Sequence, residues 1–291
     1  MPSVFVYVVL FASIFAVGLA APLAKFAHEV HPLELGFWRT GIVGLLLLCY
    51  AKVPQMSRRN WLLSIMAGVF LALHFWTWFA SLQHTSTLRS TTLVCLNPLW
   101  VGLVEWGYLR QSLGRNFWVG VLVALLGVGI MSIGTTATVE GDLWWGDFLA
   151  TVGGILGSLY LLIGREVRKE VSVDRYGAVL CLFASMCLGV GCLWENISLG
   201  GYTQEIWMVL VGMALVPQFV GHIGMQYTLR FISASTVSLA LLLEPVGASL
   251  ISYLWLQEGV GTTEILGAIV ILLGVAWGMK ATETNPSDAT E

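Results

Sequence analysis

Long apolar stretches separated by short polar turns fill the chain from its first residues almost to its end. A helix needs about 20 apolar residues to cross a bilayer core of roughly 30 Å, because it rises 1.5 Å per residue. Ten stretches reach this length, and none of the separators is long enough to fold alone. The pattern therefore predicts ten membrane-spanning helices, near residues 4–27, 33–51, 60–82, 87–108, 116–134, 145–165, 174–194, 205–230, 236–257 and 263–281.

The composition agrees with a chain that is dissolved in lipid. Hydrophobic residues make up 57% of it and charged residues only 11%, with a mean hydropathy of +0.82. A soluble domain carries about 25% charged residues, so a soluble enzyme is excluded, as is a disordered chain. The chain has 14 basic and 17 acidic residues and so lacks the cationic surface that holds phosphates, and no nucleic-acid partner is expected.

The basic residues sort to one side of the predicted topology. The loops of the opposite side carry only Lys25 and Arg89. Because cytoplasmic loops keep the positive charge, both ends of the chain are predicted to be cytoplasmic. Eleven basic residues lie on that side: Lys52, Arg58, Arg59, Arg110, Arg115, Arg165, Arg168, Lys169, Arg175, Arg230 and Lys280.

The chain contains an internal repeat at a shift of 147 residues. A proline, three glycines and a four-residue apolar run stay in register: Pro98, Gly114, Gly120 and 125–128 meet Pro245, Gly261, Gly267 and 272–275, with Gly127 and Gly274 inside the runs. Each repeat holds five helices, an odd number, so the second must enter the membrane upside down relative to the first. Inverted repeats with a substrate site between them are typical of secondary transporters.

The expected fold is therefore an all-α integral membrane protein of ten helices in two inverted five-helix repeats. Residues 1–140 and 141–281 form the repeats, and 282–291 form a cytoplasmic tail. The fifth and tenth helices, which are the most apolar and the most alike, are expected to form a structural or dimer-forming edge. Glycines four residues apart, Gly153 with Gly157 and Gly274 with Gly278, predict close helix packing.

Motifs in both repeats resemble a known family. They are Ser235-Thr236-Val237-Ser238, Leu243-Glu244-Pro245-Val246, Gln257-Glu258, Gly267-Ala268 and Leu273-Gly274-Val275, with echoes at Asn97-Pro98 and Gly120. Over essentially its whole length the chain is similar to the EamA family of the drug/metabolite transporter superfamily. The resemblance implies a ten-helix secondary carrier with both termini in the cytoplasm, which moves small organic metabolites, often outward. It names no substrate. Gln111 departs from the pattern, because the first repeat often carries an acid there that matches Glu258.

The energy source is predicted to be a gradient or an exchange. No Gly-Lys dipeptide occurs, so the chain has no phosphate-cradling loop of an ATPase, and no cofactor is expected. The five cysteines contain no C-x-x-C pair, which indicates neither a disulfide framework nor a metal site.

Charged side chains within the hydrocarbon each require an explanation, because such a charge costs about 2.5 to 3.5 kcal/mol on insertion scales. Arg39 lies about six residues into its span, and its guanidinium offers a planar fork of donors for a carboxylate or phosphate. Capping of backbone carbonyls, or pairing with an acid such as Glu34, would explain Arg39 equally well. Glu105 lies near the end of its span and could reach water.

Glu244 is predicted to couple transport to protons. It lies about eight residues into its span, and the following Pro245 removes a helix hydrogen bond beside it. A carboxyl group in such a desolvated place is suited to take up and release a proton, although a permanently neutral or paired acid is the alternative. The repeat places Asn97 at the equivalent position, so only one half could carry the proton.

Polar and aromatic residues at helical spacing are predicted to line a pathway between the repeats. Polar residues in apolar spans generally face the protein interior or a wet cavity, although hydrogen bonds made in packing would satisfy the same pattern. His74 and Trp78 share one helix face, and Gln218 and His222 share another beside the kink-prone Pro217. The residues expected to bind substrate are Arg39, His74, Trp78, Asn97, Trp100, Tyr160, Gln218 and His222.

These features predict a multi-pass carrier of the bacterial inner (plasma) membrane that works by alternating access. The expected cargo is a small organic metabolite, amino-acid-like or an amphipathic zwitterion, exported with proton coupling or by exchange. Lipophilic cations, amines or drugs are the alternative cargo, and a passive channel is the second alternative. An intramembrane enzyme that pairs Ser158 with His222 is a further alternative, although no enzyme is expected. The partners are the substrate and the lipid bilayer, and a homodimer and a monomer fit the sequence equally well.

Overall fold

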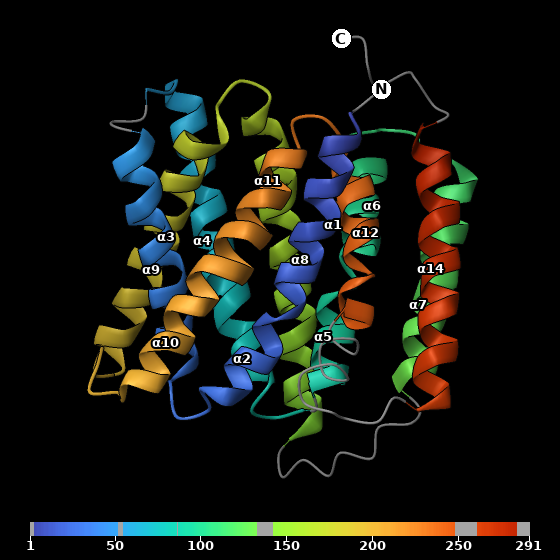
Figure 1. The fold of residues 1–291 in the computed structure, drawn as a ribbon. Helices are drawn as coiled ribbons and strands as arrows, with labels where there is room; N and C mark the ends of the chain where they lie inside the picture. Colours follow the sequence, from blue (N-terminus) through green and yellow to red (C-terminus); the bar gives the residue numbers. More distant parts are fainter. Residues whose placement is uncertain (1–2, 52–54, 86, 133–141, 248–260, 284–291) are drawn as a thin grey trace.

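The computed structural model describes residues 3–51, 55–85, 87–132, 142–247 and 261–283, and all regular structure in these ranges is helical (Figure 1). The all-α expectation is thus confirmed. Lys52, Gln257, Glu258 and most of the predicted tail lie outside the described residues, so the structure does not test what was predicted for them.

The first half of the chain supplies seven helices. A short polar side chain caps the helix that begins at Arg58: the Ser57 hydroxyl accepts a hydrogen bond from the backbone N–H of Asn60 at 3.2 Å. The helices are α1 (Val4–Gly18), α2 (Ala20–Phe26), α3 (Pro32–Ala51), α4 (Arg58–Ser81), α5 (Thr87–Val94), α6 (Asn97–Gly107) and α7 (Arg115–Ser132).

The second half has one rod with widened turns. There Pro217 lacks an N–H to donate, and the turns around it become π-helical, which joins three segments into one continuous rod. The elements are α8 (Leu143–Arg168), α9 (Val173–Trp194), α10 (Gln204–Met213), η1 (Ala214–Ile223), α11 (Gly224–Thr228), α12 (Ala234–Leu241) and α14 (Thr262–Glu283). Residues 244–247 are helical as well.

Six of these rods are long and apolar enough to cross a membrane: Val4–Phe26, Pro32–Ala51, Arg58–Ser81, Leu143–Arg168, Val173–Trp194 and Gln204–Thr228. Shorter apolar helices cover Arg115–Ile130, Ala234–Gly247 and Ile265–Met279. The predicted boundaries agree with these within a few residues, except for the end of the predicted span 236–257, which lies outside the described residues. Two predicted spans are broken: 87–108 is divided into α5 and α6 by a two-residue turn at residues 95–96, and 236–257 is interrupted after α12 by a two-residue turn at residues 242–243.

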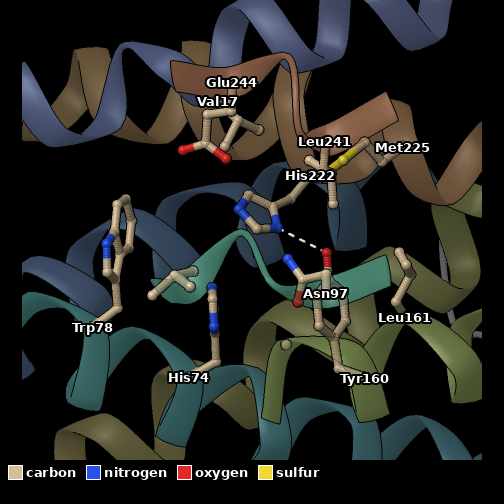
Figure 2. A pocket seen from close by; sticks show the side chains of 12 residues that line it. Val17, His74, Trp78, Asn97, Tyr160, Leu161, His222, Met225, Leu241 and Glu244 are labelled. Carbon is tan, nitrogen blue, oxygen red and sulfur yellow. Dashed lines mark hydrogen bonds between the residues drawn. The ribbon is translucent and has the colours of Figure 1, made fainter. Parts of the chain in front are cut away.

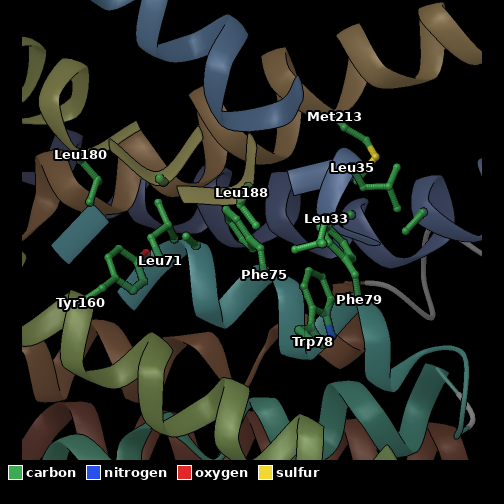
Figure 3. Packing of buried hydrophobic residues seen from close by; sticks show 14 of the residues in the cluster. Leu33, Leu35, Leu71, Phe75, Trp78, Phe79, Tyr160, Leu180, Leu188 and Met213 are labelled. Atoms are coloured by element: carbon green, nitrogen blue, oxygen red, sulfur yellow. The ribbon is translucent and has the colours of Figure 1, made fainter. Parts of the chain in front are cut away.

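The helices pack into a bundle (Figure 1). Helices α3, α4, α9 and α10 gather on one side, α1, α8 and α12 lie in the middle, and α7 and α14 stand side by side at the opposite edge. The start of α1 and the end of α14 lie at the same end of the bundle. A large apolar cluster, including Leu71, Phe75, Phe79 and Leu188, packs between α4 and α9 (Figure 3).

Glycines let α7 and α14 touch backbone to backbone. A Cβ atom added at Gly120 would lie 2.6 Å from the Cα of Gly278, and one at Gly127 would lie 2.6 Å from the amide nitrogen of Ile271. Similarly, a Cβ atom at Gly274 would lie 2.5 Å from the amide nitrogen of Ala124. No side chain fits at these distances, so the small residues set the spacing of the two helices.

Candidate transport site

A small cavity lies in the middle of the bundle, where α1, α4, α8 and η1 meet the two broken rods (Figure 2). The cavity volume that the centre of a water molecule can occupy is about 30 Å³, so the cavity has room for a few waters. A metabolite would need the walls to move. The lining residues are Val17, His74, Trp78, Val94, Asn97, Gly157, Tyr160, Leu161, His222, Met225, Leu241 and Glu244.

The break between α5 and α6 places Asn97 at the cavity. Helix α6 begins at Asn97, and Pro98 occupies its first turn, where the missing N–H costs no helix hydrogen bond. The Ser158 hydroxyl of α8 lies 2.9 Å from Asn97 Oδ1 and 2.8 Å from the carbonyl oxygen of Gly154. The amide is therefore tied to a helix of the other half of the chain.

A second break with the same backbone pattern places Glu244 at the cavity. After α12 a two-residue turn precedes residues 244–247, which are helical again, with Pro245 in the first turn. The Glu244 side chain is buried, with 7% of its residue surface exposed, and it points into the cavity (Figure 2). Its Oε2 lies 3.6 Å from the Cys95 thiol, which can donate a weak hydrogen bond.

His74 is held in one tautomer. Its Nδ1 lies 2.8 Å from the carbonyl oxygen of Gly153, and because a carbonyl only accepts, Nδ1 must carry the proton. In a neutral ring Nε2 is then the hydrogen-bond acceptor, and Figure 2 shows this side of the ring facing the cavity. The indole of Trp78 stacks against this ring with centroids 6.1 Å apart and 17° between planes.

His222 reaches the cavity from the π-helical turns of η1. Its Nδ1 lies 2.8 Å from the Tyr160 hydroxyl, and its ring centroid lies 6.2 Å from that of His74. The two histidines, predicted from the two repeats, therefore meet in space. The cavity thus combines aromatic rings, neutral hydrogen-bonding groups and one carboxyl group, and no Lys or Arg is among its described lining residues.

Three residues predicted to bind substrate are not among the lining residues: Arg39, Trp100 and Gln218. Arg39 is fully buried, and its Nε donates a hydrogen bond to Gln218 Oε1 at 2.9 Å. Its guanidinium carbon lies 4.2 Å from the centroid of the Phe75 ring, and this ring packs against the cavity-lining His74 and His222, with centroids 5.1 Å from each. Helical spacing gives the depth of a side chain, but it cannot show which neighbouring ring packs over it.

At one end of the bundle Glu34 has partners other than Arg39. It accepts hydrogen bonds from Trp38 Nε1 at 3.2 Å and from the Tyr202 hydroxyl at 2.6 Å. Burial and this bond to a carboxylate raise the pKa of Tyr202, so that it stays protonated and keeps donating. Among the described contacts none joins Glu34 to Arg39, so that explanation of Arg39 is wrong.

At the other end, charged groups join α8 to helices of the first half. Arg165 forms an ion pair with Glu105 at 3.0 Å, and the Glu105 side chain is only 1% exposed. The expectation that Glu105 reaches water is therefore wrong, because an arginine from α8 covers it. Arg59 pairs with Glu166 at 2.8 Å, which adds a second link between the halves at this end.

The enzyme alternative finds no geometric support. Ser158 lies beside Asn97 and Gly154, whereas His222 lies beside Tyr160, and no described hydrogen bond joins Ser158 to His222. Sequence reasoning also missed half of the cavity lining, the apolar or small residues Val17, Val94, Gly157, Leu161, Met225 and Leu241. Apolar residues carry no signal that separates a cavity wall from a lipid-facing surface.

A bundle of long apolar helices around a buried cavity that is lined by both polar and apolar residues defines the class: a multi-pass membrane protein. The EamA-like transporter family model matches residues 4–133 and 144–278, so the chain belongs to this family of membrane transporters, and it is not an enzyme. The family, first indicated by resemblance, is thereby confirmed.

Relatives support the same assignment. The chain is similar to the uncharacterized transporter YyaM of Bacillus subtilis (strain 168), with 26% identity over 93% of this chain and 92% of YyaM. An uncharacterized transporter of Archaeoglobus fulgidus is 25% identical over 81% of this chain and 83% of its own length. A solved crystal structure with 16% identity has a TM-score of 0.79 and covers 97% of this chain and 99% of that one, which shows the fold alone.

Proposed function

We propose that this protein is a secondary active transporter that exports a small organic metabolite across the bacterial inner (plasma) membrane by alternating access. One observation carries the proposal: the Glu244 carboxyl lies at a helix break and faces a central cavity built from both halves of the chain. Discontinuous helices that meet at the midplane between repeats are typical of secondary transporters, because their ends expose groups that bind cargo and ions.

The cargo that fits the lining is a small molecule with an amino group and an apolar body. The rings of Trp78 and Tyr160 offer aromatic faces that attract a cation, and Glu244 offers an opposite charge. An amino-acid-like or amphipathic zwitterion is our first choice. The absence of Lys and Arg among the described lining residues favours the alternative, a lipophilic amine.

Proton coupling is the proposed energy source, with Glu244 as the carrier. When cargo and proton compete for one carboxyl group, binding of the first releases the second, which links their movements. Neutral neighbours favour this role, since His74 presents an acceptor to the cavity and no described lining residue holds a fixed positive charge. Asn97, at the equivalent break, cannot exchange a proton in this way.

We further propose that the two halves are inverted repeats and that both ends of the chain are cytoplasmic. Figure 1 shows the start of α1, the start of α4, the end of α8 and the end of α14 at one end of the bundle. Arg58, Arg59, Arg165 and Lys169 lie at this end, and positive charge marks the cytoplasmic side.

The test uses purified protein in liposomes with a cargo found by thermal stabilisation against a metabolite panel. Glu244→Gln is expected to abolish accumulation driven by a pH gradient while leaving exchange of labelled for unlabelled cargo measurable. Glu205→Gln, at an exposed acid at the start of α10, serves as the matched control and is expected to behave as wild type. Unchanged proton coupling in Glu244→Gln would overturn the assignment. Saturable counterflow without ion-like conductance excludes the passive channel.

A further inference from the structure

Arg39 carries a buried positive charge that its surroundings satisfy only in part. The residue is 0% exposed, and its one hydrogen bond runs from Nε to Gln218 Oε1. Neither Nη1 nor Nη2 finds a hydrogen-bond partner within the described part of the chain. A buried guanidinium with two unused amino groups is unfavourable unless something anionic reaches it at another stage of the cycle.

Arg168, another deeply buried arginine, has hydrogen-bond partners for its guanidinium. Arg168 is 2% exposed, and it donates from Nε to the backbone oxygen of Gln226 at 2.9 Å and from Nη1 to the backbone oxygen of Val171. Arg168 therefore holds together backbone segments at the end of α8. Among the described residues Arg39 donates to no backbone oxygen in this way, so a purely architectural role does not account for its unused donors.

Phe75 separates Arg39 from the cavity. The Arg39 guanidinium lies over the Phe75 ring at 4.2 Å, a cation–π contact, and the ring of His222 approaches Phe75 edge-on at 5.1 Å between centroids. Because His222 lines the cavity, the thickness of about one aromatic ring lies between the guanidinium and the site. Figure 3 shows Phe75 next to Leu188 and Leu71 in the apolar cluster between α4 and α9.

We infer that Arg39 is an anion subsite of the carrier, closed by Phe75 in this structure, and that it takes the carboxylate of a zwitterionic cargo. The inference rests on the proposed function and names its substrate class. The Nη1 and Nη2 donors form the planar fork that binds a carboxylate with two parallel hydrogen bonds. Opening requires the Phe75 ring to move aside, which exchanges a cation–π contact for these bonds.

Charge balance favours a zwitterionic cargo over a cargo with net negative charge. Arg39 lies within electrostatic range of Glu244, so the region holds one positive and one negative group. A cargo with one carboxylate and one ammonium group pairs both and leaves no net charge buried. A phosphate monoester would bring about two negative charges to a single arginine and leave one unpaired.

The experiment compares ligands that differ only by the carboxylate. Phenylalanine and phenethylamine, tryptophan and tryptamine, and leucine and isoamylamine are titrated against purified wild-type protein, with thermal stabilisation and binding as readouts. We expect at least one amino acid to bind the wild-type protein tenfold or more tightly than its amine. Equal affinity within every pair, or no carboxylate-dependent binding at all, overturns the subsite.

Variants then locate the effect. Arg39→Gln is expected to remove the preference for the carboxylate while leaving the amine's affinity within about twofold, whereas Arg39→Lys keeps part of the preference because charge remains without the fork. Phe75→Leu, with a smaller barrier, is expected to preserve or increase the preference. Arg115→Gln, at an exposed arginine at the start of α7, is the matched control. A preference that survives Arg39→Gln overturns the assignment.

The outcome separates this inference from the carrier proposal. Proton-coupled uptake of the amines that depends on Glu244 but ignores the carboxylate would leave the carrier standing and overturn the Arg39 subsite. Conversely, a carboxylate preference that depends on Arg39, together with unchanged proton coupling in Glu244→Gln, would overturn only the coupling. If Arg39→Gln fails to fold, the wild-type ligand pairs and Arg39→Lys still decide the question.

Discussion

The two broken rods of the bundle, α5–α6 and α12 with residues 244–247, are interrupted in the same way, but the polar residues at their breaks differ in chemistry. Each break is a two-residue turn followed by a polar residue and a proline, Asn97-Pro98 in one half and Glu244-Pro245 in the other. Each also reaches across to the opposite half, since Asn97 lies beside Ser158 and Glu244 contacts Cys95. The two breaks thus share their backbone pattern, but only the carboxyl group of Glu244 can exchange a proton.

The two breaks therefore differ in whether their polar side chain can change its charge. An amide offers fixed donors and acceptors at every pH, whereas a carboxyl group can change its charge. A site with two acids would repel itself, and a site with two amides could carry no proton. The asymmetry at Asn97 and Glu244 is therefore the feature to alter, and the variants below do so from the largest expected effect to the smallest.

Asn97→Asp is expected to have the largest effect, because it makes the two breaks chemically alike. Two carboxyl groups would then face one small cavity, and either like-charge repulsion or a forced proton would follow. Transport should fall more than tenfold, and the free energy of unfolding should fall by about 3 kcal/mol. Liposome uptake and thermal unfolding measure this, with Asn196→Asp in an exposed turn as the control. Wild-type uptake in Asn97→Asp would show that the asymmetry is dispensable.

Gly157→Ala tests the close packing of α8 against His74 and Asn97. A Cβ atom at Gly157 would lie 2.9 Å from His74 Nδ1 and 3.5 Å from Asn97 Oδ1, so the His74 ring must leave the Gly153 carbonyl. We expect a loss of about 1 to 3 kcal/mol in stability and roughly tenfold in cargo affinity. Gly212→Ala is the control, because nothing lies within 4 Å of a Cβ atom there. Equal behaviour of the two variants would contradict the close packing.

Ser158→Ala removes the hydroxyl beside the Asn97 amide without adding bulk. The expected cost is about 1 kcal/mol of stability, the usual net value of one hydrogen bond, with a modest loss of affinity. Thermal unfolding and ligand titration check both quantities. A loss as large as that of Asn97→Asp would mean that Ser158 takes part directly in transport rather than positioning the amide.

Cys95→Ser is expected to have the smallest effect, on the acid side of the comparison. A hydroxyl replaces a weak thiol donor of similar shape 3.6 Å from Glu244, so stability should change by less than it does in Ser158→Ala. The stronger donor favours the ionised carboxylate, and the pH at which transport is half-maximal should therefore move down. Uptake measured across a pH series checks the direction, and an upward shift would contradict it.

The sequence predicts the rods and the equivalence of the two breaks, because length, hydropathy and the repeat of Pro98 and Pro245 are local or periodic signals. It also predicts His74, Tyr160 and His222 as substrate-binding residues, and all three line the cavity. It does not predict which side of a neighbouring helix a residue meets, and for that reason Arg39 was expected in the cavity but lies behind Phe75.

The seam between α7 and α14 has a consequence for reading natural variation. Gly120, Gly127 and Gly274 exclude any larger side chain on steric grounds alone, although none of them lines the cavity. A survey of relatives is expected to find these positions as restricted as Glu244. Invariance at these glycines would reflect the close contact between two helix backbones. A ranking of residues by invariance alone would wrongly assign these glycines to substrate recognition.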